Sequence, residues 1–342
     1  MKRLKELFWP AVGLVAVVWS LKVLYAKLHA EATTDQAIAA LIENAGFLES
    51  LKLIALQIAG KIKDNPVSDF VLAFAATLLA YWALAWYDRI ALIHLKKEKG
   101  ISWLYVTICS FTTYAISHNI GASVFSGGMV RYRAYTAKGL SAADVAVLVA
   151  LCSFTFAFGT ILLGGIVLLY EPELLQPLAP IGIGTARLIG LAMVGFCVLY
   201  TIGSWLQFKP LVIRNFKLEY PDLHVVWRQW IAAPLELIGA AGIIYFAMPG
   251  TTNPDFMVVL GAFLLSFSAG LLLQAPGGIG VMEFTFIKVM PGIPAADVLA
   301  ALLVWRLLYL LLPLAISIPV VLGFERAQLV HHHDDTRPPP AG

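Results

Sequence analysis

Apolar residues fall into long runs along this chain, and short polar connections separate the runs. A helix that crosses a bilayer needs about 20 consecutive apolar residues. Runs of about this length occur at 7–28, 67–87, 101–126, 142–170, 185–206, 229–249, 255–274 and 297–323. In hydrocarbon, backbone groups must be satisfied within the segment, as they are in an α-helix. The pattern predicts an all-α, polytopic integral membrane protein with one transmembrane domain over residues 1–326.

Two segments depart from this pattern. Residues 35–62 place apolar side chains at a spacing of three to four, with glutamates and lysines between them. This spacing favours an amphipathic helix that lies at the membrane interface, and a further tightly packed crossing is the alternative. The tail at 327–342, with three consecutive histidines and three consecutive prolines, is typical of a disordered segment.

Charge divides the connections into two groups. Those at 88–99, 129–141 and 207–228 are rich in lysine and arginine, whereas 171–184 carries two glutamates and no basic residue. Short cytoplasmic loops are enriched in basic residues. The three basic connections are therefore expected on the cytoplasmic side and 171–184 outside, and the basic N-terminus is expected in the cytoplasm.

The run at 101–126 cannot satisfy this rule as a single crossing, because the connections on both of its sides are basic. A hairpin of two arms would reach about 20 Å into a hydrocarbon core about 30 Å thick and return both flanks to the cytoplasm. Non-helical backbone at that depth is tolerated where protein or a wet cavity surrounds it. Gly121, Gly127 and Gly128 would supply the bends. We expect a re-entrant hairpin here rather than one straight spanning helix.

A second interruption follows the run at 255–274. There the sequence places a proline and three glycines, among them Gly277 and Gly278, ahead of Glu283. Paired interruptions in the two halves of a transporter point to its binding site, and the arrangement is compatible with an inverted repeat. A plain loop between two crossings is the alternative.

Composition excludes several classes of function. The chain has 342 residues, of which 60% are hydrophobic and 13% charged, with a mean hydropathy of +0.81, so it cannot solvate the surface of a soluble domain. Its net charge of +3 is too small to indicate a nucleic-acid partner, but it suits an anionic leaflet. The three cysteines lie far apart, without metal-ligand spacing. No metal, cofactor or ATP site is expected, because no zinc, nucleophile-elbow or Walker motif occurs.

The polar stretch at 114–139 offers groups that could bind an anionic lipid headgroup. In an extended segment Arg131 and Arg133 share a face, and guanidinium groups match phosphate oxygens in pairs. The backbone at Gly127 and Gly128 can approach the same phosphate. A positive-inside loop without a binding role is the alternative for these arginines. The further headgroup candidates are Tyr132, Tyr135, Asn119, Ser126 and Lys138.

Ionisable residues within the later apolar runs are the second group of candidates. Arg306 lies inside 297–323, where a charge costs about 3 kcal/mol or more unless it is paired or reaches the interface. Glu236 and Glu283 are the available carboxylates, and both a structural ion pair and a ligand-binding arginine remain open. We expect these residues to shape a polar cavity or to couple transport to an ion, together with Tyr309, Gly277 and Gly278.

Three motifs resemble elements of one family. They are Ser-Gly-Gly-Met-Val-Arg-Tyr-Arg-Ala-Tyr-Thr-Ala-Lys-Gly-Leu (126–140), Ala-Pro-Gly-Gly-Ile-Gly-Val-Met-Glu (275–283) and Trp-Arg-Leu-Leu-Tyr-Leu-Leu-Leu-Pro (305–313). In this order they resemble the transmembrane part of lysylphosphatidylglycerol synthase/flippase proteins and the stand-alone YbhN-like membrane proteins. Ala134 stands where members commonly have leucine, a change that leaves the charged and phenolic groups in place.

The resemblance implies a helical lipid transporter or flippase. Two-domain members aminoacylate phosphatidylglycerol with a soluble synthase and move it between leaflets. This chain ends soon after its last apolar run, so we expect no aminoacyl-transferase activity.

The expected function is to move an anionic or aminoacylated phospholipid, or a related lipid, between the leaflets of a bacterial inner membrane. The alternative is a membrane enzyme or accessory partner that acts on lipid headgroups with a separate soluble synthase. Membrane lipids are the expected partners, and a homo-oligomer is left open.

Overall fold

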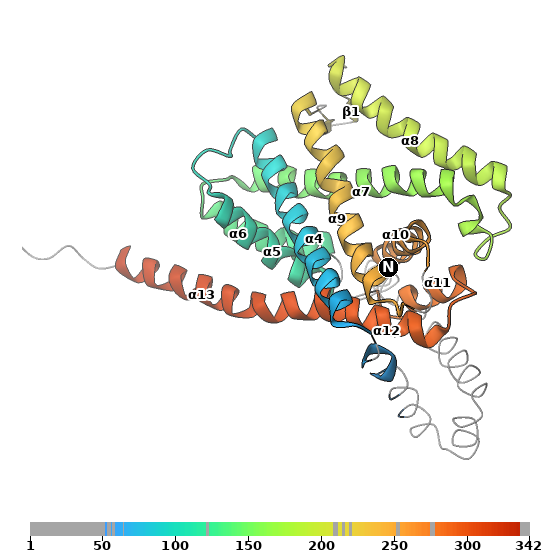
Figure 1. Cartoon of the computed structure of the whole chain (residues 1–342). Helices are drawn as coiled ribbons and strands as arrows, with labels where there is room; N and C mark the ends of the chain where they lie inside the picture. Colours follow the sequence, from blue (N-terminus) through green and yellow to red (C-terminus); the bar gives the residue numbers. More distant parts are fainter. Residues whose placement is uncertain are drawn as a thin grey trace, which may run out of the picture.

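The computed structural model describes residues 52, 56, 59–63, 65–120, 123–207, 211–213, 216–218, 221–250, 254–273 and 278–335. Within these ranges the regular secondary structure is helical apart from one hairpin of two short strands (Figure 1). Five helices in this part of the chain are long and apolar enough to cross a membrane, which confirms the polytopic helical class. The predicted run at 7–28, most of 35–62 and the position of the N-terminus lie outside the described residues.

The helices follow the predicted apolar runs with shifted boundaries. In chain order the elements are α4 (Val67–His94), α5 (Trp103–Ile120), α6 (Ser123–Thr136), α7 (Ala142–Tyr170), η1 (Pro172–Leu175), α8 (Ile183–Trp205), β1 (Leu211–Ile213), β2 (Phe216–Leu218), α9 (Leu223–Ala247), α10 (Phe256–Leu272), α11 (Val281–Val289), α12 (Ala295–Trp305), η3 (Arg306–Leu311) and α13 (Leu312–Asp335). Helix α4 continues for seven residues past its predicted end at residue 87, and α13 continues for twelve past its predicted end at residue 323.

The centre of the bundle is an antiparallel pair of long helices, α4 and α9 (Figure 1). A Cβ atom at Gly239 would lie 2.9 Å from both the Ala76 carbonyl oxygen and the Ala80 amide nitrogen. Small residues therefore let the two backbones touch. Near one end of the pair, the Asn65 side-chain amide donates to the Ala247 carbonyl over 2.9 Å. Polar side chains halfway along α4 and α9 consequently lie close to one another.

Helices α7 and α8 form a second antiparallel pair. A Cβ atom at Gly165 would lie 2.9 Å from the Gly190 carbonyl oxygen, and one at Gly190 would lie 2.8 Å from the Gly165 carbonyl oxygen. The short helix η1, with Glu173, connects the two at the end opposite to the start of α7. The acidic connection thus lies at the other end of the pair from the basic connections that precede α7 and follow α8.

Helices α5 and α6 form an antiparallel hairpin, which confirms the two-arm arrangement predicted for the run at 101–126. The second arm continues to Thr136, however, through residues that were predicted to form a connecting loop. The Tyr105 hydroxyl donates to the Ala134 carbonyl over 2.6 Å. The arms have 18 and 14 residues, or about 27 and 21 Å. The predicted bends at Gly127 and Gly128 were wrong, because both glycines lie inside α6. A Cβ atom at Gly127 would lie 3.1 Å from a threonine side chain of α5, so this glycine permits close packing. Residues 121–122 lie outside the described ranges.

Helices α10 and α11 form a second hairpin. They have 17 and 9 residues, or about 26 and 14 Å, so the run at 255–274 is an arm of a hairpin and not a full crossing. Gly278 and Gly280 have φ values of +64° and +81°, in the left-handed region that favours glycine. The chain turns back at these residues and packs α11 against α10.

Helices α12 and α13 are joined by η3, a π-helical segment, into one long helix (Figure 1). Pro313 has no amide hydrogen to donate to the Tyr309 carbonyl, four residues before it. That carbonyl instead accepts a hydrogen bond from the Tyr81 hydroxyl of α4 over 2.9 Å. Such π-helical turns are frequent at functional sites.

The C-terminal end of this helix departs from the predicted disordered tail at 327–342. Helix α13 continues through Asp335, because no proline follows Pro319 until Pro338 and several of the intervening residues favour helix. Residues 336–342 lie outside the described part of the chain.

The order of spanning helix, hairpin and spanning helix occurs twice. The first half is α4, the α5–α6 hairpin and α7; the second is α9, the α10–α11 hairpin and the helix α12 to α13. Because α4 and α9 are antiparallel, the first hairpin follows the end of α4 at one end of the bundle, and the second follows the end of α9 at the other. The two halves thus have the arrangement of an inverted repeat.

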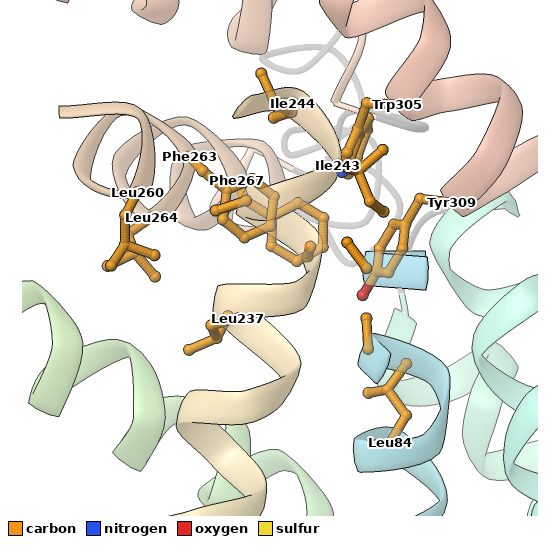
Figure 2. Packing of buried hydrophobic residues seen from close by; sticks show 14 of the residues in the cluster. Leu84, Leu237, Ile243, Ile244, Leu260, Phe263, Leu264, Phe267, Trp305 and Tyr309 are labelled. Atoms are coloured by element: carbon orange, nitrogen blue, oxygen red, sulfur yellow. The ribbon is translucent and has the colours of Figure 1, made fainter. Parts of the chain in front are cut away.

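An aromatic core lies where α9, α10 and η3 meet (Figure 2). Phe263 and Phe267 of α10 stack with ring centroids 5.2 Å apart, and Trp305 and Tyr309 stack at 5.3 Å. Figure 2 shows the Tyr309 hydroxyl directed toward α4. The core therefore fixes the side of η3 on which this hydroxyl lies.

Candidate functional site

The first polar cluster is a buried ion pair between α4 and α6. Arg131 and Asp88 are 5% and 0% exposed. The Arg131 Nη2 atom donates to Asp88 Oδ1 over 2.6 Å, and its Nε lies 3.1 and 3.2 Å from the two carboxylate oxygens. The Tyr135 hydroxyl donates to Asp88 Oδ2 over 2.9 Å, and the Cys152 thiol of α7 lies 3.4 Å from Oδ1. This network joins α4, α6 and α7.

The predicted shared face of Arg131 and Arg133 was wrong. Both lie on α6, where residues two apart point about 200° apart, so Arg131 is buried while Arg133 is exposed. The Arg131 guanidinium also lies 4.8 Å from the centre of the Tyr114 ring. Its fork is thus directed at protein groups.

Other headgroup candidates lie on the outer side of the hairpin. Tyr132 is 49% exposed, and the exposed Lys138 lies with its ammonium 4.8 Å from the centre of the Tyr105 ring. Ser126 and Gly128 are partly buried in α6. Tyr132, Arg133 and Lys138 are thus exposed on α6 and the turn after it, whereas Arg131 is buried.

Asp88 was missed by the sequence reasoning, which assigned it to a basic connecting loop. The available signal was a lone acid directly after the apolar run and Tyr87. Asp88 lies six residues before the end of the helix. At this depth its side chain cannot reach water, so it needs a partner within the protein.

The second cluster is the pair of Arg306 and Glu283, which the structure brings together. The Arg306 Nη1 atom donates to Glu283 Oε1, and their side chains are 14% and 6% exposed. The other Glu283 oxygen accepts from the Gly280 amide over 2.8 Å, which satisfies a free donor at the start of α11. Within the described ranges, the Arg306 Nε and Nη2 atoms have no hydrogen-bond partner. The pair therefore leaves two buried donors without a partner in the part of the chain that the structure describes.

The third cluster surrounds Glu236, halfway along α9. Its side chain is buried, and the Tyr309 hydroxyl donates to Oε1 over 2.7 Å. The Tyr87 hydroxyl of α4 lies 3.4 Å from Oε2. No ion pair in the described part of the chain includes Glu236. The sequence left Glu236 and Glu283 as alternative partners of Arg306; the structure pairs Arg306 with Glu283 and gives Glu236 two phenol partners.

The segment η3 links the second and third clusters and contacts both hairpins. The Asn119 side-chain amide of α5 donates to the Leu310 carbonyl over 3.0 Å. The His118 ring stacks on Tyr309 at 5.4 Å and meets Phe267 of α10 at 5.7 Å. The end of the first hairpin thus approaches the last turns of α10 beside η3. Gly277 lies outside the described residues, and Gly278 is at the turn before α11.

These features define a class of protein. Two helical hairpins from opposite ends of the bundle converge on a π-helical segment with buried ionisable groups, and five of the described helices are long and apolar enough to span a membrane, so this is a polytopic helical membrane protein. The chain belongs to the family described as Lysylphosphatidylglycerol synthase TM region, whose sequence model matches residues 11–317.

Two relatives are similar over most of their length. One is the uncharacterized protein slr0712 of Synechocystis sp. (strain ATCC 27184 / PCC 6803 / Kazusa), 29% identical over 266 residues, which are 78% of this chain and 81% of the relative. The other is the inner membrane protein YbhN of Escherichia coli (strain K12), 26% identical over 268 residues, or 77% and 82%. These matches confirm the resemblance of the three motifs and the multi-pass membrane class.

Proposed function

We propose that this protein moves an anionic phospholipid between the leaflets of a bacterial inner membrane, with the lipid phosphate bound at Arg306. The observation that carries the proposal is the half-used guanidinium group of Arg306, which gives one nitrogen to Glu283 and leaves Nε and Nη2 without a partner among the described residues. A guanidinium edge of this kind matches two phosphate oxygens.

The depth of Arg306 suits a lipid in transit. It lies 11 residues after Ala295, the start of its spanning helix, or about 17 Å along that helix. This is close to the middle of a hydrocarbon core about 30 Å thick. A buried arginine there needs a functional reason, since an unpaired donor costs about 1–3 kcal/mol.

The charge balance requires the phosphate to displace Glu283. This carboxylate neutralises Arg306, so a phosphate that takes its place exchanges one anionic partner for another. Glu283 would keep the Gly280 amide as a partner. The approach of the two hairpins beside η3 would let a headgroup pass from one leaflet to the other by movement of either hairpin.

The test is lipid exchange in proteoliposomes with trace fluorescent phosphatidylglycerol. Arg306→Lys keeps the charge and the pairing with Glu283 but loses the planar fork, and Arg306→Gln loses both. We expect exchange to fall at least about tenfold in both variants, equivalent to one or more lost charge-assisted hydrogen bonds.

Lys288→Gln is the matched control, because it removes one exposed positive charge from α11, the helix that carries Glu283, and should leave exchange unchanged. Inorganic phosphate trapped inside the liposomes tests whether the bound anion is a lipid headgroup or free phosphate. Free phosphate that binds at the site while no lipid is exchanged would indicate a site for a soluble anion. Undiminished lipid exchange in folded Arg306→Gln would refute the role of Arg306.

A further inference from the structure

The Glu236 cluster has no part in holding a phosphate, because it presents an anionic carboxyl group and phenols. It lies 13 residues after Leu223 and 11 before Ala247, so it is near the middle of a spanning helix. An ionisable side chain at this depth is expensive and marks an ion or proton pathway by default. The question is which ion it serves.

The partners of Glu236 favour a proton. Both carboxylate oxygens face phenol hydroxyls, at 2.7 Å for Tyr309 and 3.4 Å for Tyr87. A metal cation of the size of Na⁺ or Mg²⁺ would need several further oxygen ligands. A proton needs only one acceptor, and the Tyr87 oxygen can fill that role because a phenol both donates and accepts. The same atoms can therefore satisfy the carboxylate and the carboxylic acid.

Among the described residues, no ion pair fixes the state of Glu236. The groups that face it or its phenols from the neighbouring elements are Tyr81 and Tyr87 of α4, Tyr114 and His118 of α5, Cys152 of α7 and Tyr309 of η3. Asp88, one residue from Tyr87, is already paired with Arg131. The net charge of the cluster thus changes by one when Glu236 binds a proton.

Tyr309 connects this change to the proposed lipid site. Its hydroxyl donates to Glu236, and its carbonyl accepts from Tyr81. A hydrogen bond to an ionised carboxylate is about twice as strong as one to a neutral group. Protonation of Glu236 therefore weakens one of the bonds that hold η3 against α4 and α9. The same π-helical segment begins at Arg306 and binds Asn119 of the first hairpin at Leu310.

We propose that Glu236 takes up a proton within the bilayer, from carboxylate to carboxylic acid, and that this step couples lipid movement to the transmembrane proton gradient through Tyr309 and η3. The inference rests on the proposed lipid transport and adds its source of energy.

The coupling is tested in proteoliposomes with an imposed pH gradient. If one proton moves per lipid, a gradient of one pH unit should drive about a tenfold accumulation of trace phosphatidylglycerol in one leaflet. In Glu236→Gln the leaflet ratio should stay near one at every gradient. Tyr309→Phe keeps the ring and removes the hydroxyl, and should also lower the ratio. Glu173→Gln, an exposed acid of η1, is the matched control and should retain the wild-type ratio.

Proton binding is tested on the wild-type protein, so that a misfolded variant cannot decide the result. A hydrophobic carbodiimide reacts with protonated carboxyl groups in apolar surroundings, and mass spectrometry locates the adduct. Labelling of Glu236 should rise on acidification, while the ion-paired Asp88 should stay unlabelled.

The outcomes separate the two proposals. Lipid exchange that ignores the pH gradient, or Glu236 that is unlabelled at every pH, would overturn the coupling and leave the transport proposal standing. Absence of any lipid movement, with Glu236 labelled on acidification, would overturn the transport proposal and the coupling with it.

Discussion

Replacing Asp88 by asparagine tests the buried ion pair between α4 and α6. The substitution keeps the shape of the side chain but removes its charge and turns one acceptor oxygen into a donor nitrogen. Oδ1 receives Arg131 Nη2 at 2.6 Å, and Oδ2 receives Tyr135 at 2.9 Å. Either orientation of the amide therefore sets a donor against a donor and leaves Arg131 without a counter-ion.

The size of the effect follows from burial. Asp88 and Arg131 are 0% and 5% exposed, so water cannot replace the lost carboxylate. Removal of one partner of such a pair costs about 3–5 kcal/mol, because the other charge stays buried and uncompensated. In Asp88→Asn combined with Arg131→Gln that charge is gone. We therefore expect the double variant to cost less than the sum of the single variants by about 1–3 kcal/mol.

The assay is reversible unfolding in mixed micelles by titration with dodecyl sulfate, with helix content followed by circular dichroism. Asp69→Asn, near the start of the same helix and bonded to the exposed Ser68, is the control and should cost less than about 1 kcal/mol. If Asp88→Asn lowered the free energy of unfolding by less than about 1 kcal/mol, the pair would contribute no more than an ion pair at a protein surface. That result, or additive single and double variants, would refute the buried pairing.

Two further predictions concern packing and topology. Gly239→Val places a side chain against the α4 backbone, where even a Cβ atom would lie 2.9 Å from two backbone atoms. We expect it to destabilise the protein by about 1–3 kcal/mol or more. Gly195→Ala is the control, because the space around Gly195 is open, and it should be neutral; equal stability of the two variants would contradict the close packing. Cysteines introduced at Lys97 and Lys138 should react with a membrane-impermeant maleimide from the cytoplasmic side, and one at Glu173 from outside. Labelling of Lys97→Cys and Lys138→Cys from opposite sides would show that the first hairpin is a single crossing.

The lengths of the apolar runs determined most of the fold. A spanning helix must satisfy the hydrogen bonds of its own backbone, so its length can be predicted from the number of consecutive apolar residues. Loop charge likewise predicted the first hairpin, since two basic flanks belong on one side. The exact bends could not be predicted, because Gly127 serves either a turn or close packing, and only the neighbouring α5 decides between them.

The candidate site was also predicted in part from the sequence and decided in part by the tertiary structure. The sequence by itself marked Arg306, Glu236 and Glu283, because a charge within an apolar run is conspicuous wherever the chain folds. Only the tertiary structure decided their partners. Arg131 meets Asp88, 43 residues away, and Glu236 meets Tyr309, 73 residues away. Such pairs depend on which helix faces which, a choice made by small residues such as Gly239 and by the whole bundle. The local sequence therefore predicts that a charged residue is buried, whereas the residue that neutralises it is determined by the packing of the helices.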